Sequence, residues 1–157
     1  MMPKYAHPMD VIRTCVSLMA LEDKDTKDNS PKANMRKTMR IFAKTPTAVA
    51  AYFRARKGKK IISPKTKLSF AENFFYMMFN KVPDKEIVRA FDISLILYAE
   101  HSFNVSTFTA RTITSSLSDL HGAITGAIAS LKGPLHGGAN EAVMHMMKEI
   151  GKPEKAE

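Results

Sequence analysis

A single histidine, His136, stands in the glycine-rich stretch GPLHGGAN at residues 133–140. Gly133 ends one apolar-periodic segment, and Gly137 and Gly138 begin the next, so the ring is expected at a helix start, where backbone amides converge and the helix dipole is positive. That environment favours a neutral imidazole. Such a ring donates a hydrogen bond without carrying a charge, which suits it to polarise a carbonyl and stabilise an enolate.

Two other interpretations of this turn stay open on spacing alone. Glycines at a helix start also let helices cross closely, and they also form anion-binding turns. A short motif of this kind does not choose among packing, anion binding and catalysis.

The other histidines show no metal-ligand spacing. His101 lies in the second stretch that could carry chemistry, LILYAEHSFNVSTFTAR at residues 95–111. His121 and His145 are interpreted as surface or partly buried helix residues, and His7, just before a proline, as a helix cap. No carboxylate or cysteine completes a helical ligand pattern, so we expect no metal site.

Helices must position these residues, and the spacing of apolar residues predicts helix almost throughout the chain. Pro8 suits the first turn of a helix over residues 8–20, and Pro31 opens a second helix. Pro46 lies inside that second segment with Thr45 as a possible cap, so the pattern fits one kinked helix or two in tandem. Gly58 suits a left-handed stop after it.

The second half of the chain has its own start signals. Ser69 and Glu72 have the spacing of a capping box, and Pro83 with Asp84 restarts the chain after the helix that follows. Further helices are predicted to begin at Ser106, Asp119 and Gly137. No alternating strand pattern exceeds four residues, so the fold class is all-α. We expect residues 1–157 to form one helical domain, with a frayed polar tail at 151–157.

Composition narrows the class further. Cys15 is the only cysteine, which excludes an intramolecular disulfide and fits a reducing cytoplasm. No apolar run approaches the length of a membrane span, so no membrane association is expected.

The net charge of +9 is concentrated in one tract. Residues 29–71 hold twelve Lys or Arg and no Asp or Glu. Such a tract could track a nucleic-acid backbone, form a solvated helix face, or attract a polyphosphate. Tyr52 and Phe53 are adjacent rather than interleaved with the cations, and no recognition motif accompanies them, so a small basic nucleic-acid-binding protein is the lesser alternative.

Several stretches, taken in order, resemble the large domain of citrate synthases: HPMDVIRT, AKTPTAVAAYFR, ILYAEHSFNVSTFTAR and SDLHGAITGAIASLKGPLHGGANE. The wording YAEH-x-FN-x-STFTAR is most similar to bacterial 2-methylcitrate synthases. The resemblance runs from about His7 to about Ile150. It implies a multi-helical large-domain core.

The resemblance also implies an activity and a set of site residues. In the family a carboxylate removes an α-proton from acyl-CoA while the GPLHG histidine, here His136, donates to the thioester oxygen; the nucleophile then attacks oxaloacetate and the thioester is hydrolysed. His101 would contact the oxo acid, with Asn104 and Asn140 in support. Leu135, Gly137 and Gly138 would contact CoA. Acyl-CoA is then a substrate, and no tightly bound cofactor is implied. Propionyl-CoA and acetyl-CoA both stay open.

The family is built as dimers, and the sequence offers a matching surface. The helix expected at 69–80 is apolar nearly all round, with Phe70, Phe74 and Met77 on one side and Phe79 on another. We therefore expect a homodimer that uses this helix, with an ordinary core helix as the alternative. The methionines, among them Met78, Met144, Met146 and Met147, are interpreted as core filling or as a surface between subunits.

The departures from the family pattern matter equally. The Gly-x-Gly-His stretch, the catalytic aspartate and the carboxylate-binding arginines that the family places further on are not found: after Asp119 the sequence holds no Asp or Arg, and after His136 only His145. The sequence is thus interpreted as a large-domain fragment that lacks its general base.

The 157-residue chain alone is expected to be inactive. Loss of a general base removes about two to four orders of magnitude in rate, and loss of positioning groups adds to this. The measurement is release of CoA thiol from propionyl-CoA or acetyl-CoA in the presence of oxaloacetate. Turnover at ordinary enzyme rates by the purified chain would contradict the fragment interpretation.

Overall fold

The structure, a computed structural model, describes residues 3–100 and 102–155. Seven α-helices follow one another, and the described residues contain no strand: α1 (Pro8–Glu22), α2 (Pro31–Arg56), α3 (Phe70–Phe79), α4 (Lys85–Leu97), α5 (Val105–Ser115), α6 (Leu120–Leu131) and α7 (Gly138–Ile150). A short 3₁₀ helix, Pro153–Lys155, follows α7. The all-α prediction is confirmed.

Capping side chains set several of the helix starts. The Nδ1 atom of His7 accepts from the amide of Met9, 3.2 Å away, so His7 is indeed a cap. Ser69 and Glu72 form the predicted capping box, with both reciprocal hydrogen bonds present. Asp119 accepts from the amide of Gly122 and begins α6. These local bonds satisfy amides that the first helical turn would otherwise leave without partners.

The structure decides one open alternative in favour of a single helix and differs from one predicted boundary. α2 runs without a break through Pro46, and the hydroxyl of Thr45 donates back to the carbonyl of Ile41, 2.7 Å away, instead of capping a second helix. α5 begins at Val105, with Asn104 as its cap rather than Ser106 as its start. In both places a side chain makes a hydrogen bond within its own turn that the sequence pattern does not reveal.

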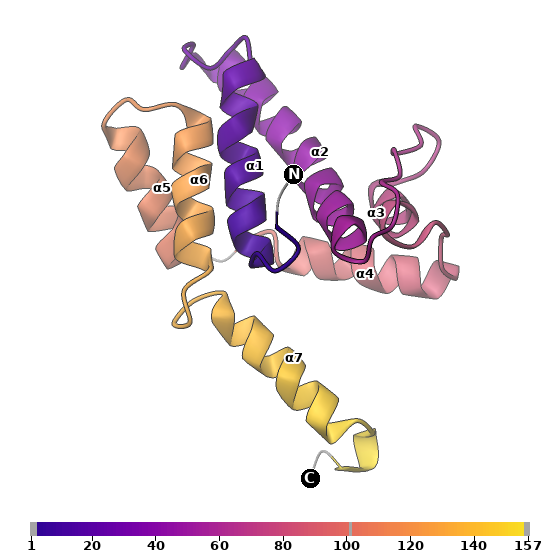
Figure 1. Cartoon of the computed structure of the whole chain (residues 1–157). Coiled ribbons are helices and arrows are strands. Elements are labelled where there is room, and N and C mark those ends of the chain that lie inside the picture. The colour runs from indigo at the N-terminus through magenta and orange to yellow at the C-terminus, as the bar shows by residue number, and fades with distance from the viewer. Residues whose placement is uncertain (1–2, 101, 156–157) are drawn as a thin grey trace.

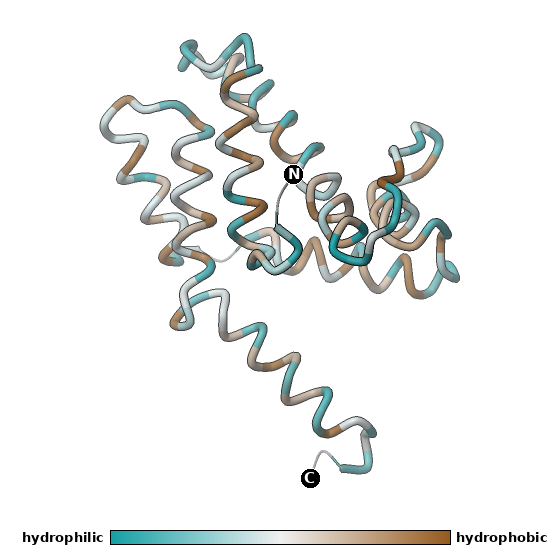
Figure 2. Tube along the Cα trace, viewed as in Figure 1, coloured by the Kyte–Doolittle hydropathy of each residue, from teal (hydrophilic) through white to brown (hydrophobic). Residues whose placement is uncertain are grey.

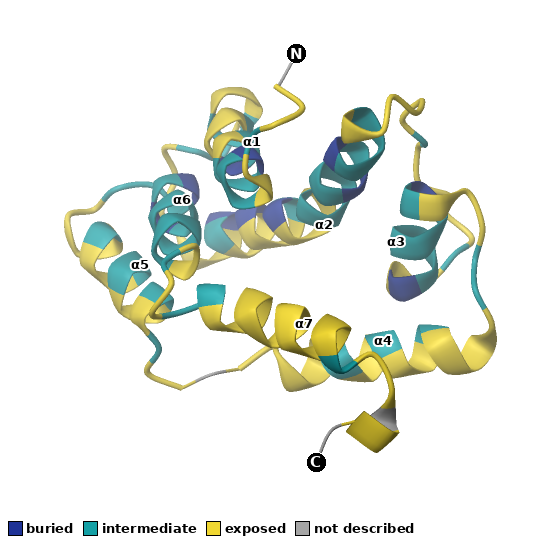
Figure 3. Ribbon diagram, turned by 60° about the horizontal axis from the view of Figure 1, so that its bottom comes forward, coloured by how far each residue is buried: buried dark blue, intermediate teal, exposed yellow. Residues whose placement is uncertain are grey.

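The helices pack as a body of six, with α7 projecting from it (Figure 1). α1 lies against α2 and α6, α5 pairs with α6, and α3 lies between α2 and α4. The buried residues cluster in α1, α2, α3 and α6, whereas α4, α5 and α7 contain no fully buried residue (Figure 3). The body therefore leaves much apolar side-chain surface uncovered.

The helix α3 has neighbours on two sides. The ring of Phe79 meets Phe53 of α2 edge-on, and Phe74 stacks on Phe91 of α4 at 5.2 Å between ring centroids. Phe70 and Phe79 remain partly exposed, at 38% and 50%. Contacts on two sides fit the core-helix alternative as well as an interface, so the homodimer through residues 69–80 stays a prediction.

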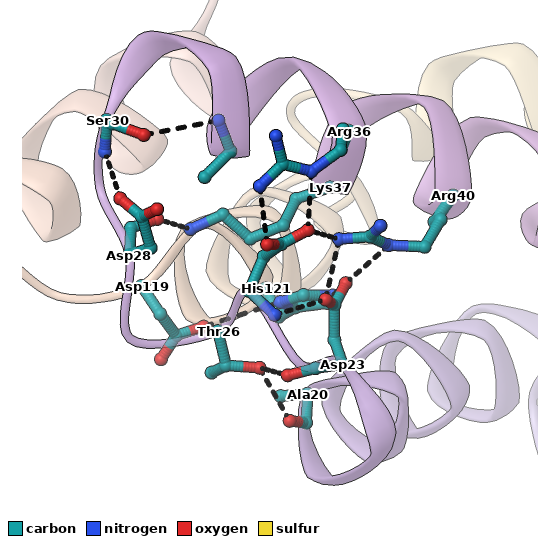
Figure 4. A network of polar contacts seen from close by, with 12 residues as sticks. Ala20, Asp23, Thr26, Asp28, Ser30, Arg36, Lys37, Arg40, Asp119 and His121 are labelled. Atoms are coloured by element: carbon teal, nitrogen blue, oxygen red, sulfur yellow. Dashed lines mark hydrogen bonds and ion pairs between the residues drawn. The ribbon is translucent and has the colours of Figure 1, made fainter.

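A polar network holds the loop between α1 and α2 (Figure 4). Arg40 forms a bidentate ion pair with Asp23 and also bonds Asp25, and Arg36 is bidentate to Asp25. These hydrogen bonds from Arg36 and Arg40 hold the pKa of Asp25 well below its usual range. The ammonium of the fully buried Lys37 donates to the carbonyl of Asp28, 2.7 Å away. Three cations of the basic tract thus bind the acidic loop of the same chain.

His121 lies inside this network, so the interpretation of His121 as a surface or partly buried residue is wrong. Its side chain is 1% exposed, with Nε2 3.3 Å from Asp23 and Nδ1 3.8 Å from Asp119. Burial lowers the pKa of His121, although the two carboxylates oppose that shift. The sequence shows only that His121 lies in the first turn of a helix; the contact with Asp23 depends on how α1 packs on α6.

This burial predicts an acid-sensitive stability. The folded chain keeps His121 neutral to lower pH than the unfolded chain does, so its contribution is complete above about pH 6.5 and is lost as pH falls below that value. His121 should add at most about 1.4 kcal/mol per pH unit to the slope of the unfolding free energy against pH, which is the value for one proton. Urea unfolding from pH 8 to 5 of the wild type and His121→Gln measures it, with the exposed His145→Gln as control. A wild-type slope no steeper than that of His121→Gln would refute the assignment.

Candidate active site

The turn between α6 and α7 holds His136 by backbone hydrogen bonds. The carbonyl oxygen of Gly133 accepts from the amide of His136 at 3.0 Å and from the amide of Gly138 at 3.1 Å. The side chain of His136 is half-buried. The carbonyl of Gly133 therefore closes the turn at His136 and again two residues later, which fixes the position of the His136 Cα.

The imidazole is fixed by a partner from another helix. Nε2 of His136 lies 3.0 Å from the hydroxyl oxygen of Ser106 on α5. That hydroxyl donates to Oδ1 of Asn104, 2.7 Å away, and the same Oδ1 accepts from the amide of Thr107. Three polar side chains from two distant segments form one hydrogen-bonded chain.

The direction of these bonds follows from the donors available. The amide of Thr107 can only donate, so the amide oxygen of Asn104 must face it, and Ser106 gives its single proton to that oxygen. Ser106 must then accept from His136, which places a proton on Nε2. Nδ1 is the ring atom left for a substrate.

The backbone amides that could bind an anion at this turn already donate to other groups. The amides of Gly138, Ala139 and Asn140 bond the carbonyls of Gly133, His136 and Gly137, at 3.1 to 3.2 Å. Amides that cradle a phosphate must be free to point at it. The first three amides of α7 are engaged within the turn itself.

Close packing explains the glycines of the turn. A Cβ at Gly137 would lie 2.3 Å from the carbonyl oxygen of Leu131, and one at Gly138 would lie 3.1 Å from that of Gly133. The first distance is shorter than real Cβ contacts, and the obstacle is backbone, which cannot rotate away. Glycine at 137 is thus required by the turn, whether or not CoA also approaches it.

The structure gathers part of the predicted site. His136, Asn104, Gly137 and Gly138 lie around one turn, and Leu135 at its apex is 99% exposed. Asn140 is exposed in the first turn of α7. His101 lies outside the described residues. Ser106 was not predicted as a site residue, and the only signal for it is its place two residues after Asn104.

Residues 3–100 and 102–155 contain neither a metal-binding cluster nor a membrane-spanning helix. No group of three or more His, Cys, Asp or Glu side chains is placed to hold a metal ion. No helix in this part of the chain is long and apolar enough to cross a membrane.

Comparison with known proteins bears on this geometry. The family model described as "Citrate synthase, C-terminal domain" matches residues 1–157. The chain is 52% identical over 155 residues to a citrate synthase of Mycolicibacterium smegmatis and 53% identical over 155 residues to a 2-methylcitrate synthase of Mycobacterium tuberculosis. It covers 41% and 39% of those proteins, and they cover 99% of this chain.

A solved structure agrees. The crystal structure of citrate synthase from Thermotoga maritima superposes with a TM-score of 0.80 at 40% identity, covering 98% of this chain and 39% of that one. Fold and sequence together point to one family of helical proteins. The chain belongs to the citrate synthase family. It spans about two fifths of the length of the curated relatives it matches.

Gly137→Ala is expected to disturb the site through its backbone. The added methyl group would meet the carbonyl of Leu131, so the turn must open and the bond between His136 and Ser106 should be lost. Overpacking of this kind costs about 1 to 3 kcal/mol. Urea unfolding measures the stability, and ¹⁵N shifts of the His136 ring report the hydrogen bond.

Gly122→Ala is the matched control. It lies in the first turn of α6, where the closest obstacle, 3.3 Å from the new Cβ, is the rotatable hydroxyl of Ser118. Its ring shifts should equal those of the wild type. Equal ring shifts in Gly137→Ala would show that the turn does not depend on glycine at 137.

Proposed function

We propose that this chain is part of an acyl-CoA:oxaloacetate C-acyltransferase of the 2-methylcitrate synthase type, which condenses propionyl-CoA with oxaloacetate. The observation that carries the proposal is the imidazole of His136, held by Ser106 in a turn closed by Gly133, within a chain that matches the family along its whole length. Acyl-CoA is a substrate here, and no tightly bound cofactor is required.

The proposed chemistry assigns His136 to the thioester. A base removes a proton from the α-carbon, charge develops on the thioester oxygen, and a donor aimed at that oxygen stabilises it. The enol carbon then forms a bond to the keto carbon of oxaloacetate, and water releases CoA from the product thioester. His101, with Asn104 and Asn140, would bind oxaloacetate, and Leu135, Gly137 and Gly138 would contact CoA.

The hydrogen-bonded chain at His136 constrains how the ring can donate. With the proton on Nε2, a neutral ring offers Nδ1 only as an acceptor. To donate from Nδ1 while neutral, the ring must move its proton to Nδ1 and Ser106 must turn its hydroxyl toward Nε2. Ser106 can therefore accept from Nε2 or donate to it, but donating to Nε2 takes the hydroxyl proton away from Oδ1 of Asn104.

A second acyl donor is supported by the same comparisons. Acetyl-CoA is the alternative substrate, since a relative named citrate synthase is as similar as one named 2-methylcitrate synthase.

Nucleic-acid binding, the other alternative, has less support. Three cations of the basic tract are engaged within the chain, because Arg36, Lys37 and Arg40 bind the acidic loop. We further propose that the chain acts as a homodimer, which the exposed apolar side chains support.

The test places this chain in a complete enzyme. Residues 1–157 replace the matching stretch of the Mycolicibacterium smegmatis citrate synthase, and turnover is measured with propionyl-CoA and with acetyl-CoA. We expect the chimera to be active and His136→Ala to lower kcat about 10²- to 10³-fold, as removal of an oxyanion donor does. The control is His145→Ala on the exposed face of α7. A folded chimera whose turnover is unchanged by His136→Ala would refute the proposed role.

A further inference from the structure

The segment HPMDVIRT at residues 7–14 has no task in the proposed chemistry, yet it lies beside the His136 turn. It begins α1, and Figure 1 shows the start of α1 next to the end of α6. The ammonium of Lys132, the residue directly before Gly133, donates to both carboxylate oxygens of Asp10, at 2.9 and 2.7 Å. These two residues are 122 positions apart in the sequence. The start of α1 thus holds the entry to the turn that carries His136.

The carboxylate of Asp10 is charged and suitably placed for this contact. It lies in the first turn of α1, where the helix dipole favours a negative charge, and the guanidinium of Arg13 donates to its Oδ1 at 3.0 Å. The hydrogen bond from Lys132 lowers the pKa of Asp10. The side chains of Asp10 and Lys132 are partly exposed, and an ion pair in that setting adds little to the stability of a whole fold. Loss of the pair should therefore be felt at the turn rather than across the molecule.

The start of α1 also faces the far side of the turn. Nδ1 of His7 caps α1, which leaves Nε2 to face α7, and Nε2 lies 3.9 Å from Oε2 of Glu141. Lys132 precedes His136 by four residues, and Glu141 follows it by five. One helix start therefore borders both ends of the turn.

The turn needs an anchor of this kind because α7 supplies little support. The helix α7 is an arm that projects from the body, with hydrophilic and hydrophobic positions interleaved along it (Figure 2), and it contains no buried residue. The bonds to the carbonyl of Gly133 fix the shape of the turn but not its place relative to Ser106 on α5. That place depends on the last residues of α6, and helix ends fray unless they are held. Lys132 is the C-cap of α6, and it is the residue that Asp10 holds.

We propose that Asp10 is a positioning residue, which holds the end of α6 through Lys132 so that the ring of His136 meets Ser106. Asp10 acts on the reaction only through His136. Its effect on the ring is independent of the proposed function, whereas its effect on turnover rests on that function. Separate measurements of the ring and of turnover therefore distinguish failure of this proposal from failure of the proposed function.

The first experiment follows the His136 ring in the 157-residue chain. Asp10→Asn and Lys132→Met should each move the ¹⁵N shifts of the ring toward those of Ser106→Ala, in which the ring has lost its partner. The double variant should move them no further than either single variant, because both changes remove one contact. Lys132→Arg keeps the charge and Arg13→Met removes the other partner of Asp10, so both should give wild-type shifts. Wild-type shifts in Asp10→Asn and Lys132→Met would overturn the proposal.

The second experiment measures turnover in the chimera with the Mycolicibacterium smegmatis enzyme. Asp10→Asn should lower kcat about tenfold and leave KM for oxaloacetate within about twofold, since a misplacement of about 1 Å can cost about 10²-fold in rate. In the His136→Ala chimera the same change should lower kcat by less than about twofold, because the residue through which Asp10 acts is gone. An equal loss in both backgrounds would overturn the proposal. If His136→Ala itself left kcat unchanged, the proposed function would fail, and the ring shifts would still decide the role of Asp10.

Discussion

The carbonyl of Gly133 accepts two backbone hydrogen bonds, and both the site and the arm depend on that closure. It fixes the Cα of His136 on one side and the first residue of α7 on the other. The same peptide group therefore determines where the imidazole meets Ser106 and in which direction the following helix leaves the body.

A second constraint is electrostatic and lies at the opposite end of α1. Arg36, Lys37 and Arg40 lie on one side of α2 and bind an acidic loop that has few apolar residues of its own. Because the buried ammonium of Lys37 and the buried carboxylate of Asp23 would be costly without partners, α2 and this loop must be placed together. His121 is enclosed as a consequence, since α6 packs on α1 above the same loop.

The features that the sequence predicted are local ones. The capping box at Ser69, the cap at Asp119 and the start at Pro31 depend on residues within one turn, so spacing alone identifies them. The burial of His121 and the bond from Ser106 to His136 join residues far apart in the chain. Such contacts are decided by which helices pack together, and periodicity carries no information about that. The sequence predicts the turn at His136 because the glycines that form it are visible in the sequence. It does not predict Ser106 as the hydrogen-bond partner of His136.

Asn104 performs two tasks with one oxygen, since it caps α5 and orients the hydroxyl of Ser106. An aspartate would cap the helix as well, for it is an equally good acceptor there. Its carboxylate, however, would place a negative charge two hydrogen bonds from the ring of His136. The uncharged amide caps the helix and orients the hydroxyl without that charge, so fewer side chains can do both tasks here than can cap a helix.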